Sequence, residues 1–312
     1  MNEKTLKSNG FTLIELLVAV SIVSTLASVV LVGLQGAKDK GRVGGAIQFD
    51  DSLHMAYGAD LFGRADFTNG SLNGPIETAE TYTVRAGGNA VLSNDTPDGG
   101  GYSASLTSGF GYLTMSKMYS MTTIVAYTVS VWVKPSSSDP SYPNATYIVV
   151  AADCTNGPAC SDGTPYDSYP VYVYVRYSGG TSYVGYGDKF GTPSPYPASP
   201  AGGGECQVNI PIDKWTHISV SYSGETSHGG TNMLGLWIDG KAVDQSGSNC
   251  TLSSQVVPGN PYRVYGDDHI PFDGVSTGFN FGTLSKVLSS PKLHVDTIKL
   301  DNISVYPHPI DI

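Results

Sequence analysis

The feature that most constrains this chain is a predominantly apolar stretch without charged residues near its start, from Leu16 to Leu34. As an α-helix this stretch extends for about 29 Å, because each residue adds about 1.5 Å. That length nearly spans the hydrocarbon core of a bilayer. One carboxylate, Glu15, directly precedes the stretch. A charge at this place needs an explanation, because charged side chains in a membrane are costly.

The order of segments around the apolar stretch differs from that of a secretory signal. The first residues, MNEKTLKSNG, are polar and contain two lysines. A secretory signal has a shorter apolar core, and its small-residue cleavage site follows that core. Here the junction between Gly10 and Phe11 precedes the apolar stretch. The sequence therefore predicts another kind of processing.

The stretch GFTLIELLVAV, residues 10–20, resembles the processing signal of bacterial type IV pilins and of the pseudopilins of type II secretion. In that family prepilin peptidase, a membrane enzyme, cuts after the glycine and methylates the new N-terminus. The resemblance covers residues 1 to about 57. It implies a leader over residues 1–10, cleavage between Gly10 and Phe11, N-methylation of Phe11, and an assembly role for Glu15.

A role in assembly gives the charge of Glu15 a physical reason. The carboxylate lies one helical turn, about 6 Å, inside the new N-terminus, near the membrane interface, where burial costs less than at the bilayer centre. In a bundle of helices staggered by one turn, it comes level with the Phe11 ammonium of a neighbour. At 4 Å and an effective dielectric near 20, such a pair attracts by about 4 kcal/mol before desolvation is subtracted. The alternative is that Glu15 only favours the positive end of its own helix.

The remainder of the N-terminal segment is expected to be helical. Its apolar residues lie almost all round the helix, as in a segment buried first by lipid and then by neighbouring helices. Ser21, Thr25 and Ser28 either permit close helix approach or bond preceding carbonyls. Most pilins have a proline where this chain has Val32, so the weak part is the glycine-containing segment 33–45, each glycine costing about 1 kcal/mol relative to Ala. Beyond it, a helical pattern is expected to pack on the head: Ile47, Phe49, Leu53 and Tyr57.

From about Gly58 the pattern changes to short alternating runs separated by turn residues, which predicts strands. The runs span 127–135, 145–153, 171–177, 215–224, 234–243 and 294–307. Irregular spacing without alternating helices indicates an antiparallel sandwich. The expected fold class is therefore a long N-terminal α-helix (11–57) plus an all-β antiparallel sandwich head (58–312).

Three segments of the head, YTVSVWVKP, DKWTHISVSYSG with MLGLWIDGKAV, and IKLDNISVYP, are similar to strands of concanavalin A-like, laminin-G-like jelly rolls. The resemblance covers roughly residues 58–308. It implies that a strand within 57–74 pairs near the last strand.

The four cysteines, Cys154, Cys160, Cys206 and Cys250, show no CxxC spacing of a zinc or thioredoxin site. We expect two disulfides formed in sequential order in an oxidising compartment, four buried thiols being the alternative. The larger loop, between Cys206 and Cys250, gives roughly 4 kcal/mol in chain-entropy models.

Catalytic and nucleic-acid functions lack support in the sequence. A retaining glycan hydrolase needs two carboxylates about 5 to 5.5 Å apart, and none of the head's four glutamates lies in a strand with the Glu-Asp-Glu alternation typical of such enzymes. The six histidines form no HExxH motif. With a net charge of −10 and no basic stripe, the chain has little to bind a phosphate backbone. We expect neither an enzyme nor a nucleic-acid partner.

Binding by the head is left open. Laminin-G-like domains often hold calcium, and the candidate ligands here are Asp267, Asp268 and Asp273. The alternative is that these three residues are solvated turn residues. Tyr172 and Tyr174 alternate with valines that face the core. Three roles are open for the tyrosines: stacking on sugars, packing on another subunit, or covering the sheet. The Pro- and Gly-rich segment 190–204 is a candidate contact between heads.

These observations predict a non-enzymatic subunit of an extracellular pilus-like filament. Its precursor sits in the bacterial inner membrane, and its partners are prepilin peptidase, the pilus assembly machinery and other copies of itself. The alternatives are a pseudopilin of a type II secretion system and a pilin-anchored adhesin for a glycan ligand.

Overall fold

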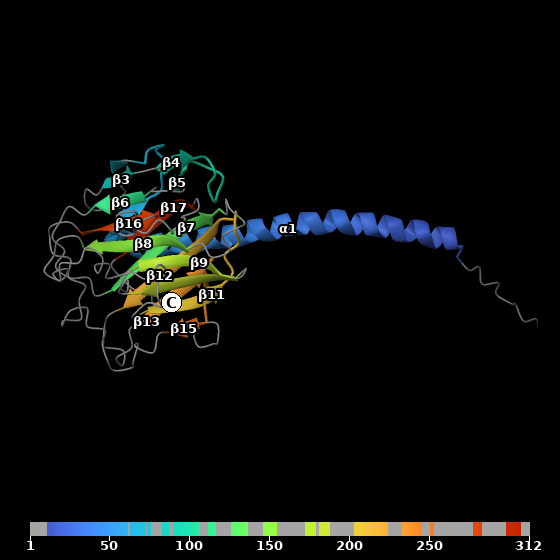
Figure 1. The fold of residues 1–312 in the computed structure, drawn as a ribbon. Helices are drawn as coiled ribbons and strands as arrows, with labels where there is room; N and C mark the ends of the chain where they lie inside the picture. Colours follow the sequence, from blue (N-terminus) through green and yellow to red (C-terminus); the bar gives the residue numbers. More distant parts are fainter. Residues whose placement is uncertain are drawn as a thin grey trace, which may run out of the picture. The chain divides into compact units, whose positions relative to one another are not determined.

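The computed structural model describes residues 11–61, 63–72, 74–75, 83–87, 90–106, 112–116, 126–136, 146–154, 172–178, 181–187, 203–223, 233–244, 250–252, 277–282 and 298–306. Figure 1 labels its elements. One long helix, α1 (Leu13–Tyr57), continues into a 3-10 turn, η1 (Gly58–Asp60). The chain divides into two compact units, Met1–Gly44 and Gly45–Ile312. The end of α1 thus belongs to the same unit as the strands.

Strands that lie far apart in the chain form the first sheet. Its order is β14-β13-β12-β7-β17-β5-β4, and β1 also pairs with β17. Their bounds are β1 Gly63–Ala65, β4 Ala90–Ser93, β5 Ser103–Leu106, β7 Ala126–Pro135, β12 Thr216–Ser223, β13 Met233–Ile238, β14 Lys241–Ala242 and β17 Ile298–Tyr306.

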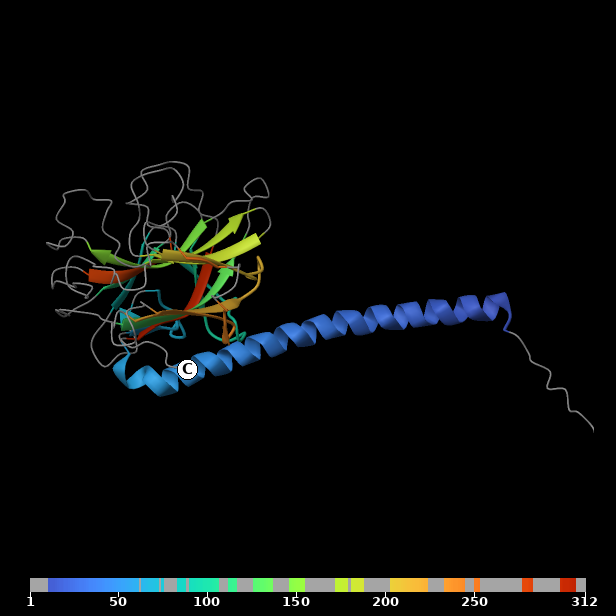
Figure 2. The same ribbon diagram turned by 90° about the horizontal axis from the view of Figure 1, so that it is seen from below.

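The second sheet has the order β15-β11-β10-β9-β8-β16-β6-β3-β2. Its strands are β2 Gly74–Pro75, β3 Thr83–Gly87, β6 Tyr112–Ser116, β8 Thr146–Cys154, β9 Tyr172–Ser178, β10 Thr181–Gly187, β11 Gly203–Val208, β15 Cys250–Leu252 and β16 Thr277–Gly282. Every described pairing in both sheets is antiparallel, and Figure 2 shows the sheets as two layers. The expected fold class, one long helix plus an antiparallel β-sandwich, is confirmed.

The six expected strand segments all contain strands, with ends that differ by a few residues. The segment 234–243 is a hairpin, because Asp239 and Gly240 have positive φ angles (51° and 73°) and form the tight turn between β13 and β14. The expected pairing of an early strand with the last is confirmed: β1 pairs with β17, with Gly63 opposite Val305.

The main core lies between the sheets and follows the alternation of the strands. Val129, Val131 and Val133 of β7 point into it from the first sheet, and Val173 and Val175 of β9 from the second, as expected for the valines. Burying one such side chain stabilises the fold by about 1.5–3 kcal/mol. The core fixes which side chains of the first sheet point outward, toward the end of α1.

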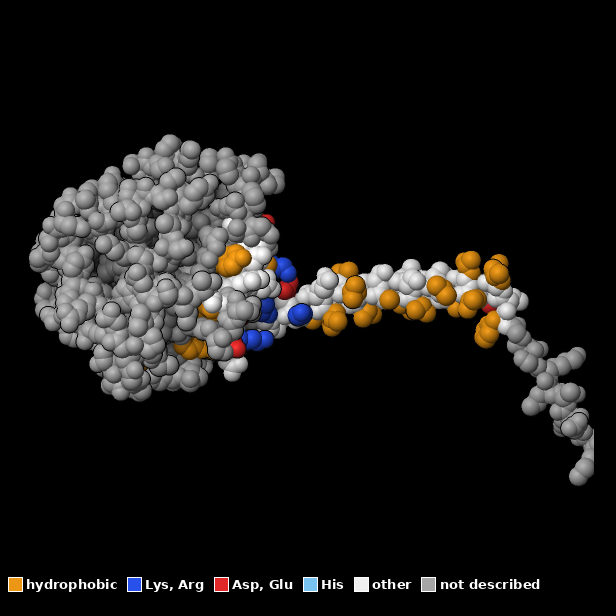
Figure 3. Space-filling model, turned by 60° about the horizontal axis from the view of Figure 1, so that its bottom comes forward, with side chains coloured by type: hydrophobic (Ala, Val, Ile, Leu, Met, Phe, Trp, Pro, Cys, Tyr) orange, Lys and Arg blue, Asp and Glu red, His pale blue; other side chains and the backbone are white. Residues whose placement is uncertain are grey.

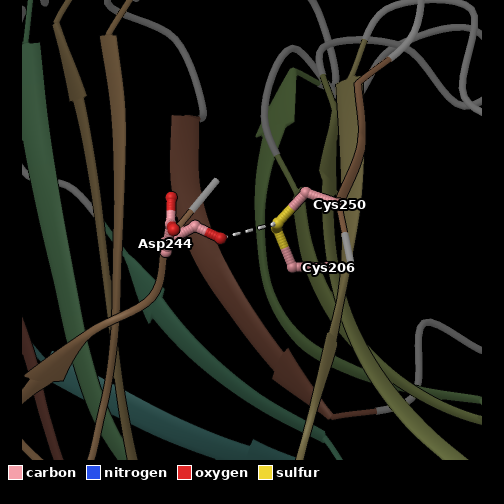
Figure 4. Close-up of a disulfide and its surroundings, with 3 residues drawn as sticks. All are labelled: Cys206, Asp244 and Cys250. Atoms are coloured by element: carbon pink, nitrogen blue, oxygen red, sulfur yellow. Dashed lines mark hydrogen bonds between the residues drawn. A yellow bond between two sulfur atoms is a disulfide. The ribbon is translucent and has the colours of Figure 1, made fainter. Parts of the chain in front are cut away.

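A disulfide joins Cys206 of β11 to Cys250 of β15, residues directly opposite each other in the second sheet. Figure 4 shows it beside Asp244, whose carbonyl oxygen lies 3.8 Å from Cys250 Sγ. Of the other two cysteines, Cys160 lies outside the described residues, and only the backbone of Cys154 is described.

Candidate functional site

The first part of α1 is apolar and exposed along its length. Its aliphatic side chains are at least about half exposed: Leu13, Ile14, Leu16, Leu17, Val18, Val20, Ile22, Val23, Leu26, Val29, Val30, Leu31, Val32 and Leu34. By length and composition α1 qualifies as a membrane span. A surface of this kind requires lipid or other protein around it.

The helix begins with a capping box formed by Thr12 and Glu15. The backbone N–H and the hydroxyl of Thr12 both donate to Glu15 Oε2 at 2.8 Å, and the Glu15 N–H donates to Thr12 Oγ1 at 3.3 Å. This pattern satisfies free N–H groups at the helix start. The capping box was not among the predictions, although Thr-x-x-Glu directly before an apolar run is its signature. The carboxylate of Glu15 is therefore already bonded in a single chain.

The structure describes the other predicted N-terminal residues to different extents. Phe11 is 88% exposed just before the helix, whereas Gly10 lies outside the described residues. The serine and threonine hydroxyls bond preceding carbonyls: Ser21 that of Val18, Thr25 that of Ile22, and Ser28 that of Ser24. The segment 33–45 stays helical despite its glycines.

The last turns of α1 pack on the outer face of the first sheet, as the helical pattern predicted. Leu53 is buried in a small cluster with Leu61, Trp237 and Tyr306, and Phe49 and Tyr57 pack against the cluster. We call this covered surface the docking face. Its residues from the two central strands are Thr128, Ser130 and Trp132 of β7 and His217, Ser219 and Ser221 of β12, all buried.

A buried polar cluster ties α1 to the docking face. Ser130 Oγ donates to Asp50 Oδ1 at 3.0 Å and lies 2.8 Å from His217 Nε2, which is itself 3.4 Å from Asp50 Oδ1. Ser219 Oγ donates to Ser130 Oγ at 3.2 Å. Burial acts to raise the pKa of Asp50, but His217, Ser130 and Arg64 together outweigh it and hold that pKa below its ordinary value. Asp50 is thus held as a carboxylate.

Aromatic rings surround this polar cluster. Phe49 of α1 lies edge-on to His217, with ring centroids 5.8 Å apart, and stacks on Trp237 at 6.5 Å. Two glycines make room. A Cβ at Gly240 would come 2.8 Å from Phe49 Cβ, and a Cβ at Gly235 would come 2.1 Å from the ring of Trp237. The fit of α1 depends on these small residues of β13 and its turn.

Ser130, His217 and Asp50 do not form a catalytic triad. In a triad the hydroxyl contacts one ring nitrogen of the histidine and the carboxylate contacts the other. Here both contact Nε2, and Nδ1 of His217 has no hydrogen-bond partner within the described part of the chain. All three side chains are buried. The cluster is therefore a structural contact between α1 and the first sheet, which we call the joint.

Two other carboxylates of the head have shifted pKa values. Asp95 accepts hydrogen bonds from Lys134 Nζ at 2.7 Å, Lys299 Nζ at 2.6 Å and Trp215 Nε1 at 3.0 Å. Partial burial opposes ionisation, but these donors lower the pKa of Asp95 to about 2. Asp301 shows the reverse: mainly through burial, its pKa rises to about 8.

The described residues contain no cluster of three or more His, Cys, Asp or Glu side chains able to hold a metal ion. The calcium candidates Asp267, Asp268 and Asp273 lie outside the described residues, as does most of the segment 190–204. For Tyr172 and Tyr174 only the backbone is described.

Residues 5–31 match the family model described as the prokaryotic N-terminal methylation motif. The N-terminal segment is a type IV pilin motif. The resemblance expected from GFTLIELLVAV is thereby confirmed. The pilin motif covers Gly10, Phe11 and Glu15 together with most of the exposed apolar part of α1.

The other comparisons are weaker. No curated protein matches the chain in sequence. Among solved structures, the binding domain of botulinum neurotoxin serotype G is 9% identical, with a TM-score of 0.47 over 80% of this chain and 48% of that one. The binding domain of neurotoxin DC in complex with SialylT is 12% identical, with a TM-score of 0.46 over 81% and 48%. This chain spans about half the length of those domains, and their ligands are not transferred to it.

Proposed function

We propose that the chain is a structural subunit of an extracellular type IV pilus-like filament, made as a membrane-anchored precursor. The observation that carries the proposal is the N-terminal methylation motif over residues 5–31, at the start of a helix whose apolar side chains are exposed. In this proposal the leader 1–10 is removed between Gly10 and Phe11, and Phe11 is methylated. The helix is buried by lipid in the precursor and by other copies in the filament.

Glu15 has two successive partners in this proposal. In the precursor Thr12 bonds its carboxylate, at 2.8 Å from both N–H and hydroxyl, which lowers the cost of holding a charge at the membrane interface. In the filament the Phe11 ammonium of a neighbouring copy is the second partner, and it is present only in the correct stagger. The buried charge thus selects the register of the bundle.

The head is proposed to be a non-enzymatic, laminin-G-like jelly roll on the filament surface. One observation supports a role without catalysis for the buried polar cluster: Ser130, His217 and Asp50 are buried beneath α1 and lack triad geometry.

Replacing Glu15 by Gln tests the proposal, since it removes the charge and retains much of the shape. We expect E15Q protein to be exported and its head to fold, while sheared surface fibres seen by electron microscopy are lost. The control D51N removes an exposed charge elsewhere on α1 and should leave fibres intact. Mass spectrometry of the wild-type fibre band should find methylated Phe11 at the N-terminus. Normal fibres from E15Q, or a band that begins at Met1, would contradict the proposal.

The same fibres distinguish the alternatives. A pseudopilin of type II secretion forms only a short pseudopilus. If the chain were a pseudopilin, wild-type cells should show no long fibres, and deletion of the chain should abolish type II secretion.

For the adhesin alternative, a glycan array with and without calcium tests the head. The fragment should begin at Gly45, because Ala46, Asp50 and Leu53 are buried in the head unit. Binding in neither condition would count against a glycan ligand.

A further inference from the structure

A short basic segment follows the apolar part of α1. Within Lys38–Arg42 there are three basic residues and one acid, Asp39, which gives a net charge of +2. Lys38 and Lys40 are exposed, and Arg42 is partly covered, with Nε 4.0 Å from the Asp39 carboxylate. The surroundings in sequence are strongly acidic, since residues 43–312 contain 12 Lys and Arg against 24 Asp and Glu. The positive charge is therefore local.

The position of this basic segment along the helix matches a membrane surface. Lys38, Lys40 and Arg42 follow Leu34, the last residue of the apolar run, by about 6, 9 and 12 Å along the axis at about 1.5 Å per residue. With Leu34 at the edge of the hydrocarbon, these distances lie in and just beyond the headgroup region, which is roughly 5–8 Å deep on each side. Figure 3 shows Lys and Arg side chains following the orange apolar part of the helix.

The charges also lie on more than one side of the helix. At about 100° per residue, Lys38 and Arg42 share a face while Lys40 lies nearly opposite. A single partner helix would contact one face, whereas lipid headgroups surround a spanning helix on every side. Lysine and arginine side chains are long enough to reach phosphates at slightly different depths.

We propose that Lys38, Lys40 and Arg42 bind the phosphates of anionic phospholipids in the leaflet farther from Phe11, and so fix the depth of the precursor in the membrane. This inference rests on the membrane-anchored precursor of the proposed function. The inference adds a class of lipid and three lipid-binding residues to that proposed function.

The test is the selectivity of the reconstituted chain for spin-labelled phosphatidylglycerol over spin-labelled phosphatidylcholine, measured by electron spin resonance in phosphatidylcholine bilayers. All proteins carry K4Q and K7Q, so that the leader contributes little. With about 1 kcal/mol for each basic side chain near the surface, and partial compensation by Asp39, we expect roughly a five-fold preference or more at low salt. It should fall to near unity in K38Q/K40Q/R42Q.

The control K214Q/K241Q removes two charges from exposed positions of the head and should leave the preference unchanged. Insertion without a preference, or a preference that persists in the triple variant, would overturn the inference alone. Extraction of the chain from the phosphatidylcholine bilayers by carbonate would instead overturn the membrane anchor of the proposed function, and the lipid site with it.

Discussion

The Asp50 carboxylate of α1 lies 3.4 Å from His217 Nε2 of β12, and both side chains are buried. Ser130 bridges them. A buried carboxylate is costly unless it is bonded on several sides, so this contact favours one seating of the helix over a shifted one. A shift of α1 by one turn would leave Asp50 and His217 unpaired inside the protein.

Replacing Asp50 by Ala should therefore destabilise the head unit by about 3 kcal/mol, because a buried hydrogen-bonded group loses its partner. D50N keeps part of the hydrogen bonding and should cost less. Urea unfolding followed by tryptophan fluorescence measures this directly, since Trp132 and Trp237 line the docking face. The control D51A alters the adjacent, exposed carboxylate and should stay within about 0.5 kcal/mol of wild type. Equal midpoints for D50A and D51A would show that the joint contributes nothing.

Gly235→Ala should destabilise the protein through one contact. The added methyl would lie 2.1 Å from the Trp237 ring, so the indole must move off the strand and away from Phe49, at a cost of about 1–3 kcal/mol. In a W237L background the same change should cost much less. A double-mutant cycle from urea midpoints measures the coupling; additive effects would contradict it.

The sequence alone was sufficient to predict those strands in which a two-residue alternation is clear. YTVSVWVKP alternates small or aromatic residues with valines, and β7 covers the whole run and begins one residue before it. Of the short early strands only β1, within 57–74, was expected, and it was expected from the resemblance to jelly rolls. The strands β2 to β6 were not predicted, because segments of two to five residues carry too little alternation to stand out among Gly, Asn and Ser. Two of them also pair with strands far away in the chain, β5 with β17 and β6 with β16.

The docking face was harder to predict from sequence. Phe49 and Leu53 indicated that α1 packs on the head, but Asp50 between them looked like an ordinary surface charge. On β12, His217, Ser219 and Ser221 form the face that normally contacts water. They are buried because α1, which is far away in the sequence, packs on this face. The local sequence of β12 does not predict that contact.

Removing the disulfide with C206S/C250S should lower the free energy of unfolding by about 2–5 kcal/mol. The bond connects two cysteines that are 44 residues apart in the chain, and β15 is a strand of three residues at the edge of the sheet. Thermal unfolding with and without reductant gives the measurement, and C154S/C160S is the matched control. Non-reducing peptide maps should link Cys206 to Cys250. A map that links either to Cys154 or Cys160 would contradict the pairing.

Ionised Asp95 should stabilise the head, and this stabilisation should be lost in strong acid. Its pKa of about 2 lies below the unfolded value of about 3.9, so its contribution is present above about pH 4 and is lost as the pH falls toward 2. Because the side chain is 32% exposed, solvent screening leaves about 1 kcal/mol. D95N should raise the midpoint pH of acid unfolding. In K134Q/K299Q, which lacks both ammonium partners, D95N should have a smaller effect; an unchanged effect would exclude the ion pairs as its cause.

Asp301 should produce a pH dependence of the opposite sign. Asp301 is 5% exposed. Burial, with smaller effects from the charges of Asp98 and Asp66, raises its pKa to about 8, although a hydrogen bond from the Asn302 N–H at 2.8 Å acts the other way. A carboxyl whose pKa rises on folding favours the folded state while it is protonated in both states. That contribution is lost progressively as the pH rises from about 4 to about 8.

The free energy of unfolding should therefore fall by a few kcal/mol between pH 4 and pH 8 through this one group. In D301N the uncharged amide retains an oxygen for the Asn302 N–H, so the fall should shrink and the variant should be more stable than wild type at pH 8. Urea midpoints across this range, compared with D51N as a surface control, measure the difference. If D301N showed the same slope as wild type, the carboxyl of Asp301 would have to ionise freely in its buried position, against the burial and the neighbouring charges that raise its pKa.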